Sequence, residues 1–287
     1  MNIAVLSDIH SNHTALEACL DSFKNKEIDA YIFLGDYIGE FPCPERTLDK
    51  LYALQKEMPC YILRGNKEEY QMKGIGGENP AWAPYLSTIG MIRYGFRHTR
   101  ETDLSYFEKL PTTMRVEFEG LPALRICHGS PRAVREDIIP GNPVNEEIFA
   151  EVEEDYILCG HTHRVVRVKE YGKTVLNPGS VGLSLDGSGC AQCMILHGKD
   201  GTWEPEFLSV PYDISKAIEE MKSEKLYELA PYWTKVTESL LTGGVHSHGE
   251  VLAKAMALCE EQTGVCNWPE IPEEIWKQAY KELFGTN

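Results

Sequence analysis

The sequence predicts an α/β protein in which a second β-sheet packs on the first and a helical segment follows both. Three observations support this prediction. Short apolar runs alternate with helical patterns over residues 1–63, which is typical of a parallel sheet with right-handed crossovers. Short strand patterns follow one another over residues 113–210, which indicates a second sheet flanked by helices. Beyond Tyr212 the apolar residues recur at helical spacing.

The first sheet begins at residues 3–6, an apolar run without polar alternation, so we expect a strand that is buried on both faces. Helical spacing over residues 11–24 predicts the crossover helix that follows. Strands are then expected at 30–34 and 60–63, with a helix at 45–57 between them. The carboxyl ends of three such strands share one sheet edge, where open α/β sheets bind their ligands.

A helical insertion is expected at about 81–110, because residues 81–96 and 103–109 have helical patterns. The strands of the second sheet follow, and one helix at 145–152 interrupts them. These strands are expected at 114–118, 123–127, 156–159, 165–168, 174–176, 190–196 and 206–210. The sandwich domain is thus predicted to span residues 1–211.

Residues 212–287 form the predicted C-terminal extension, and they contain no set of residues typical of a catalytic site. Breaks at Ala230-Pro231, Gly243-Gly244 and Trp268-Pro269 separate its helices. We expect these helices to pack against the sandwich or to form a homo-oligomer. In a third interpretation, they reach over the ligand-binding edge of the first sheet and help to select the substrate. The segment His246-Ser247-His248 is expected to be an exposed loop.

Five of the predicted strands end in an aspartate, an asparagine or a histidine. Any one of these residues could be a helix cap or a core histidine. As a set they indicate a metal site, because carboxylate oxygens and imidazole nitrogens are common ligands of Mn²⁺, Fe and Zn²⁺. The residues are Asp8 and His10, Asp36, Asn66, His128, and His161 with His163.

The ordered set resembles the calcineurin-like metallophosphoesterases, and more narrowly their small bacterial phosphodiesterase branch. The family pattern D-x-H, G-D, G-N-H-[DE], H and G-H-x-H appears here over residues 1–211. Its elements are Asp8-Ile9-His10, Gly35-Asp36, Gly65-Asn66-Lys67-Glu68, His128 and Gly160-His161-Thr162-His163. The resemblance implies a four-layer α/β/β/α sandwich. One position departs from the pattern, since Lys67 stands where many relatives carry a histidine.

The resemblance also implies a dimetal site with Asp36 as the bridging ligand. Asp8, His10 and His163 would bind one divalent ion, and Asn66, His128 and His161 would bind the other. The ions would be Mn, Fe or Zn. A metal-bridging hydroxide would then attack phosphorus in line with the leaving group. Catalytic roles are expected for Asp36, Asn66, Lys67 and His128.

Three residues are weaker candidates for substrate contact: Lys67, Asn177 and Arg64. Asn177 lies in the segment Asn177-Pro178-Gly179-Ser180, which resembles a family element near the metals but equally fits a simple turn. Lys67 has an ordinary pKa near ~10.4, so it is a poor acid at neutral pH unless the metals depress that pKa. This predicts a preference for leaving groups that need little protonation, such as nucleotide or aryl phosphates. The alternative is an exposed lysine without a role.

The predicted function is therefore hydrolysis of a small phosphodiester or a nucleotide, including dinucleoside polyphosphates. A phosphomonoesterase or protein phosphatase is the alternative within the same chemistry. A catalytically silent scaffold, as in the retromer subunit of this family, is the alternative from another class. We rank the scaffold last because all seven ligand positions are intact.

The charge composition of the chain limits the kinds of molecule that it can bind. The chain has 28 basic and 44 acidic residues, a formal net charge of −16, which disfavours long nucleic acids and anionic membranes. A small phosphate ester can still bind, since divalent ions reverse the local potential. The apolar run at residues 2–6 is too short for a signal peptide, and no apolar run approaches the ~20 residues needed to span a bilayer. We expect a cytoplasmic protein.

Overall fold

The computed structural model describes residues 1–75, 77 and 79–285, so the last two residues of the predicted extension lie outside the described residues. Its first sheet has the strand order β10-β9-β1-β2-β3. β1, β2 and β3 are parallel, whereas β9 runs antiparallel to β1 and to β10. The strands are β1 (Asn2–Leu6), β2 (Ala30–Phe33), β3 (Cys60–Ile62), β9 (Ala191–Lys199) and β10 (Thr202–Val210).

The second sheet has the order β4-β5-β6-β8-β7, with β5, β6 and β8 parallel. Its strands are β4 (Thr113–Val116), β5 (Leu124–Cys127), β6 (Tyr156–Leu158), β7 (Val165–Glu170) and β8 (Lys173–Pro178). The sheets pack face to face around one apolar core, in which Ile3 and Val5 of β1 join Ile126 of β5 and Leu158 of β6. The alternate β1 residues, Ala4 and Leu6, are also buried, because helices cover the outer face of this sheet.

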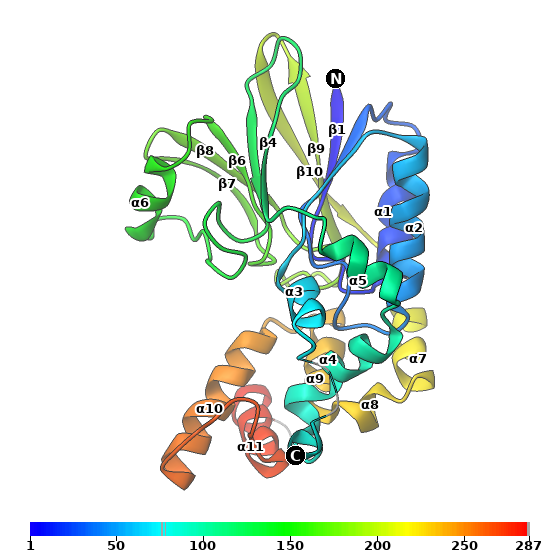
Figure 1. Ribbon diagram of the computed structural model, residues 1–287, viewed down its shortest axis with the longest axis vertical. Coiled ribbons are helices and arrows are strands. Elements are labelled where there is room, and N and C mark those ends of the chain that lie inside the picture. The colour runs from blue at the N-terminus through cyan, green and yellow to red at the C-terminus, as the bar shows by residue number, and fades with distance from the viewer. Residues whose placement is uncertain (76, 78, 286–287) are drawn as a thin grey trace.

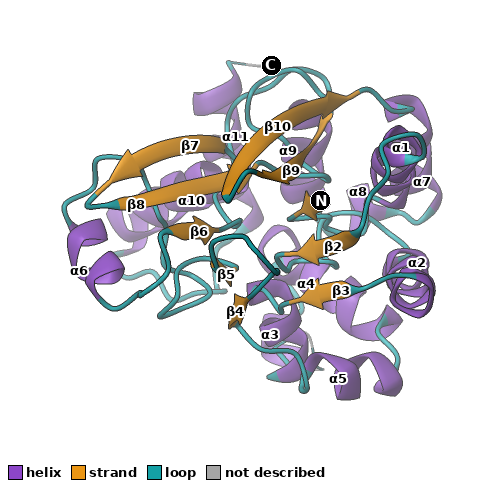
Figure 2. Cartoon of the chain, turned by 90° about the horizontal axis from the view of Figure 1, so that it is seen from above, coloured by secondary structure: helices purple, strands orange, loops and turns teal. Residues whose placement is uncertain are grey.

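Helices complete the four layers, as predicted. α1 (His13–Phe23) and α2 (Pro44–Glu57) lie on the outer face of the first sheet, together with α5 (Glu101–Phe107). On the other side of the molecule α6 (Val144–Ala150) packs Ile148 and Phe149 onto the second sheet (Figure 2). The predicted α/β/β/α fold is confirmed.

The C-terminal helices lie at one end of the sandwich, beside α3 (Asn66–Met72) and α4 (Leu86–His98) (Figure 1). They are α7 (Ile214–Ser223), α8 (Leu226–Leu229), α9 (Pro231–Leu241), α10 (His248–Thr263) and α11 (Glu273–Phe284). They share an apolar core with Met91 and Tyr94 of α4 (Leu86–His98). Gly90 permits the close approach of α4 to α8, because a Cβ at this position would lie 1.9 Å from the carbonyl oxygen of Leu229. The predicted insertion and the predicted extension therefore pack together, although they are far apart in the sequence.

Three helices were not expected from the sequence: α3, α8 and α9. α3 (Asn66–Met72) is short and mostly polar, so it has no apolar spacing to reveal it. The predicted break at Ala230-Pro231 separates α8 from α9, which begins with Pro231 because proline is favoured in the first turn of a helix, where its missing N–H needs no partner. In the predicted insertion, a short turn of helix at Pro80–Trp82 precedes α4, which starts only at Leu86. None of the described helices is both long and apolar enough to cross a membrane.

A buried glutamate ties together three strands of the second sheet. Glu154, just before β6, accepts hydrogen bonds from Arg115 of β4 (3.0 Å) and Arg125 of β5 (2.9 and 3.1 Å). Its side chain is 0% exposed. Burial raises the pKa of Glu154, but its hydrogen bonds, including those from both arginines, outweigh burial and lower the pKa below its ordinary value of 4.5.

We expect Glu154→Gln to lower the free energy of unfolding by about 1.5–3 kcal/mol at neutral pH, the usual range for hydrogen bonds to charged groups. Because the pKa is lower in the folded state, the contribution of Glu154 is complete above pH 4.5 and is lost as pH falls through the folded-state pKa. Urea unfolding at neutral and acidic pH measures both effects. Glu117→Gln is the matched control, since Glu117 also pairs with Arg115 but is 69% exposed. Equal losses in the two variants would contradict the assignment.

Candidate metal centre

The loops that leave the strands carry unusual backbone conformations at the expected site. Asp8, His10, Asp36, His161 and His163 all have positive φ, between 54° and 65°. For residues other than glycine such conformations cost about 1–3 kcal/mol each and persist only where the surroundings fix them. Backbone hydrogen bonds join two of these loops, from the N–H of Asp8 to Gly35 (3.1 Å) and from the N–H of His10 to Asp36 (2.9 Å). Strained residues that cluster in this way are typical of functional sites.

One cluster of ligand atoms is formed by Asp8, His10 and His163, whose donor atoms lie within 4.8 Å of one another. The Nε2 atoms of the two histidines are 2.9 Å apart, and Oδ1 of Asp8 is 3.4 Å from Nε2 of His163. His163 donates Nδ1–H to the carbonyl oxygen of Leu183 (2.9 Å), which leaves the lone pair of Nε2 directed at the cluster. Oδ1 of Asp8 is buried and has no hydrogen-bond partner. A cation would satisfy this atom.

A second cluster is formed by Asp8, Asp36 and His128. His128 donates Nδ1–H to Leu34 (2.8 Å), so its Nε2 faces Oδ1 of Asp36 at 3.5 Å and Oδ1 of Asn66 at 3.2 Å. The other oxygen of Asp36 lies 3.9 Å from Nε2 of His10, in the first cluster. The carboxylate of Asp36 therefore faces histidines of both clusters.

The pKa values of the two aspartates are shifted in opposite directions, although both side chains are buried. Burial raises the pKa of Asp36, and the negative charge of Asp8 adds to this effect. For Asp8 burial also raises the pKa, but His163, His128 and His10 outweigh it and the pKa falls well below its usual range. Two adjacent carboxylates that are both nearly inaccessible to water repel each other, and a bound cation would offset their negative charge. The donor set thus fits divalent cations.

His161 lies at the margin of this arrangement. Its ring is 5.1 Å from that of His128, measured between centroids, but its Nε2 faces Oδ1 of Asp137 at 3.5 Å. The two clusters found among the described residues do not include it. Its backbone N–H donates to Oδ2 of Asp8 (2.9 Å), so the residue helps to hold Asp8 in place. A role as metal ligand stays a prediction.

Lys67 is not an exposed lysine. Its side chain is 17% exposed and forms a close ion pair with Glu40, which is 4% exposed. Burial lowers the pKa of Lys67, but the carboxylates of Glu40 and Asp36 outweigh burial and raise the pKa above its ordinary value. The raised pKa favours the charged form of Lys67 beside the clusters.

Two of the three candidates for substrate contact are bonded to backbone groups and do not line the cavities beside the clusters. Arg64 donates from Nη1 to the carbonyl oxygen of Leu110 (2.7 Å), in the loop after α5. Asn177 is fully buried, donating to Gly160 (2.8 Å) and accepting from the N–H of Gly179 (2.9 Å). It holds the loop that carries His161 and His163. A role of either residue in substrate contact stays a prediction.

Glu68 has a structural role that we did not predict. Its carboxylate is fully buried and accepts hydrogen bonds from the backbone N–H groups of Asp36 (2.9 Å), Tyr37 (2.8 Å) and Gly65 (2.8 Å). Burial and the charge of Asp36 raise the pKa of Glu68 to about 7. This residue joins the loop after β2 to the start of α3. The acidic position at the end of the G-N-x-[DE] element was the available signal.

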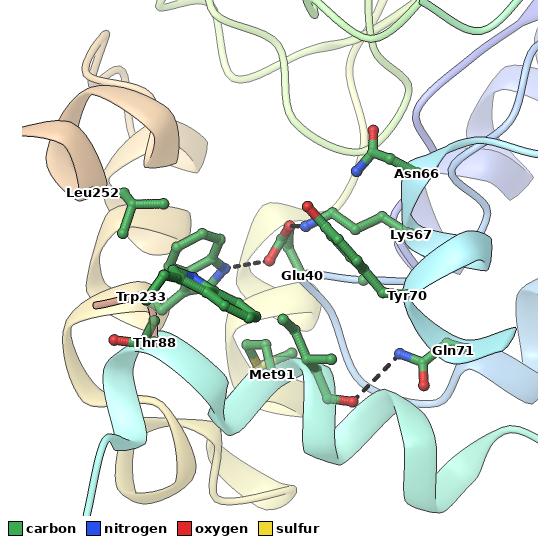
Figure 3. Close-up of a pocket in the computed structure, with 12 residues that line it drawn as sticks. Glu40, Asn66, Lys67, Tyr70, Gln71, Thr88, Met91, Trp233 and Leu252 are labelled. Carbon is green, nitrogen blue, oxygen red and sulfur yellow. Dashed lines mark hydrogen bonds and ion pairs between the residues drawn. The ribbon is translucent and has the colours of Figure 1, made fainter. Parts of the chain in front are cut away.

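The C-terminal extension contributes Trp233 and His248 to the same site. The indole Nε1–H of Trp233 donates to the second oxygen of Glu40, and the Lys67 ammonium lies 5.6 Å from the centre of the indole ring (Figure 3). His248 stacks on Trp233 with 4.5 Å between ring centroids. Burial lowers the pKa of His248 to about 4. His248 is the first residue of α10, and its ring packs against Trp233 of α9. The expectation that His248 lies in an exposed loop is therefore wrong.

A cavity of about 440 Å³ opens beside these groups. Its walls include His10, Asp36, His161 and His163 from the sandwich and Trp233 and His248 from the extension. The helices that follow residue 212 thus form one wall of the site, as the third interpretation of the extension expects.

Comparison with known proteins decides the family. Residues 1–201 match the model of the calcineurin-like phosphoesterase superfamily domain. The chain belongs to the calcineurin-like phosphoesterase superfamily. Membership in this superfamily supports a metal-dependent hydrolase of phosphoric esters, and the two clusters are candidate ligand sets for its divalent ions.

Other proteins are similar to this chain in sequence or in fold. An uncharacterized protein of Methanocaldococcus jannaschii is 28% identical over 245 residues, which cover 79% of this chain and 94% of the relative. Solved structures of a hypothetical protein from Pyrococcus horikoshii OT3 and of a metallophosphoesterase from Sphaerobacter thermophilus give TM-scores of 0.71 and 0.68. They are 22% and 23% identical and cover 86% and 85% of this chain, with 99% of each of their own chains.

Proposed function

We propose that this phosphoesterase hydrolyses a small phosphodiester or nucleotide with two divalent ions, Mn, Fe or Zn. The observation that carries the proposal is the position of Asp36, whose two carboxylate oxygens face histidines of different clusters, His128 at 3.5 Å and His10 at 3.9 Å. A carboxylate in this position is suited to bridge two ions. Asp8, His10 and His163 would hold one ion, and Asn66, His128 and, after a rotation of its ring, His161 would hold the other.

Two ions at such a site would activate a water molecule, orient the phosphoryl oxygens and offset the charge of the transition state. The protein supplies the remaining parts. Glu68 and the backbone hydrogen bonds between the loops hold Asp8 and Asp36 in their strained conformations. Lys67 supplies a fixed positive charge next to the clusters, where the leaving group develops negative charge.

The raised pKa of Lys67 supports the predicted preference for leaving groups that need little protonation, such as aryl or nucleotide phosphates. The cavity of about 440 Å³ supports a small substrate, and Trp233 and His248 of the extension contribute to its walls. Self-association through the C-terminal helices stays a prediction.

Hydrolysis by metal-stripped protein tests the proposal. We expect no turnover of bis-p-nitrophenyl phosphate after chelation and recovery when Mn²⁺ is added back. Diester turnover is expected to exceed that of p-nitrophenyl phosphate. A preference for the monoester would favour the phosphomonoesterase alternative. Turnover of neither ester by protein that binds Mn²⁺ would contradict the proposed function.

A further inference from the structure

A second, smaller cavity adjoins the candidate metal centre. Its volume is about 100 Å³, and Glu40, Asn66, Lys67 and Trp233 line both this cavity and the larger one. The two cavities therefore share a wall that contains Lys67. The substituent of a phosphate ester held at the clusters would have to pass Lys67 to enter the smaller cavity.

The far walls of this cavity are apolar. Met91 and Ile92 come from α4, Leu252 from α10 and Trp268 from the loop before α11, while Tyr70 comes from α3 (Figure 3). Gln71 also lines the cavity, where it donates to the carbonyl oxygen of Ile92 (3.3 Å) while its Oε1 is buried without a hydrogen-bond partner. Other polar groups of the lining are paired within the protein. Trp233 donates to Glu40, and the Thr88 hydroxyl accepts a hydrogen bond from Trp276 (2.8 Å). Such walls bind an apolar group better than a sugar or a charged group.

We propose that this cavity binds a small apolar group carried by the phosphate ester, a short alkyl chain. The volume sets the size, because an apolar cavity of about 150 Å³ binds benzene in another protein. A space of about 100 Å³ is smaller than that, so it accepts a short alkyl chain better than a ring and is too small for a purine. This inference rests on the proposed function and narrows its substrate class to esters with a compact apolar substituent.

Calorimetric titration of the Mn²⁺-loaded protein with methylphosphonate and butylphosphonate tests the inference without turnover. Both ligands carry the same anion, and they differ by three methylene groups. At about 0.8 kcal/mol for each buried methylene, butylphosphonate is expected to bind about ten- to fiftyfold more tightly. Benzylphosphonate is expected to bind less tightly than butylphosphonate, and a purine-bearing phosphonate is expected to gain nothing over the methyl compound.

Leu252→Trp fills the cavity and is expected to reduce the preference for butylphosphonate to less than about threefold, with the affinity for methylphosphonate unchanged. Met256→Trp is the matched control, because Met256 lies one turn further along α10, is also half-buried and does not line the cavity. It is expected to keep the full preference. Circular dichroism and Tm verify that both variants fold.

The outcomes separate the two proposals. Equal affinity for both phosphonates in the wild type, or an undiminished preference in folded Leu252→Trp, would overturn the apolar site and leave the phosphoesterase assignment intact. Absence of binding by either phosphonate would overturn the apolar site as well. If, in addition, the Mn²⁺-loaded protein hydrolysed no p-nitrophenyl ester, the proposed function would be contradicted as well.

Discussion

Asp36→Asn is expected to reduce kcat for bis-p-nitrophenyl phosphate by about 10³-fold or more. Asparagine keeps the shape of the side chain and can still accept the hydrogen bond from the N–H of Lys67 (2.9 Å), but it removes the charge that faces both clusters. The variant should nevertheless fold well. Because burial and the neighbouring Asp8 raise the pKa of Asp36, removal of this carboxylate relieves repulsion in the metal-free protein, whose Tm is expected to stay constant or rise.

Steady-state kinetics and thermal unfolding of the same preparation measure both parts of this prediction. Asp49→Asn is the control, since Asp49 is an exposed aspartate (60%) that pairs with Arg100. It should change neither kcat nor the Tm of the metal-free protein by a large amount. Full activity of Asp36→Asn would contradict the proposed role of Asp36 as a bridging ligand. A lower Tm together with lost activity would indicate a structural aspartate.

Lys67→Met is expected to lower kcat by about 10²-fold, with a smaller change in KM. The methionine side chain fills similar space but removes the positive charge next to the clusters, and loss of a single group that stabilises transition-state charge costs about this much. Lys73→Met serves as the control, because Lys73 lies at the end of the same helix and its side chain is 57% exposed.

A double variant separates the chemical role of Lys67 from its ion pair. Lys67→Met leaves the carboxylate of Glu40 buried without its partner, which costs stability and perturbs the site. Glu40→Gln in the same chain removes that charge. If Lys67 only neutralises Glu40, the double variant should regain activity; if Lys67 acts on the substrate, activity should stay low. Recovery to near the wild-type kcat would therefore disprove the proposed role.

Much of the fold and of the site was predictable because local patterns determine them. The run at residues 3–6 is buried on both faces as expected, and the residues that follow the strands of both sheets converge at one edge. Asp8, Asp36 and His128 come together although they are far apart in the sequence, because parallel strands carry their carboxyl ends to the same place. The prediction of a metal site required only the residue types and their order.

The wall of the site was not predictable in this way. The contacts of Glu40 with Trp233 and of Trp233 with His248 depend on how α9 and α10 pack onto the sandwich, and no local pattern specifies that packing. Arg64 and Asn177 illustrate the converse case. Both follow or end a strand near the site, but the direction of each side chain depends on nearby carbonyl groups that sequence spacing does not reveal. Neither residue lines the cavities beside the clusters.

The measurement that tests the dimetal assignment most directly is the number of Mn²⁺ ions bound per chain at saturation, determined by equilibrium dialysis and elemental analysis of the wild type and Asp8→Asn. Asp8 belongs to both clusters, so the account predicts two ions per chain in the wild type and fewer in the variant. Absence of saturable binding, or the same stoichiometry in folded Asp8→Asn, would contradict the account.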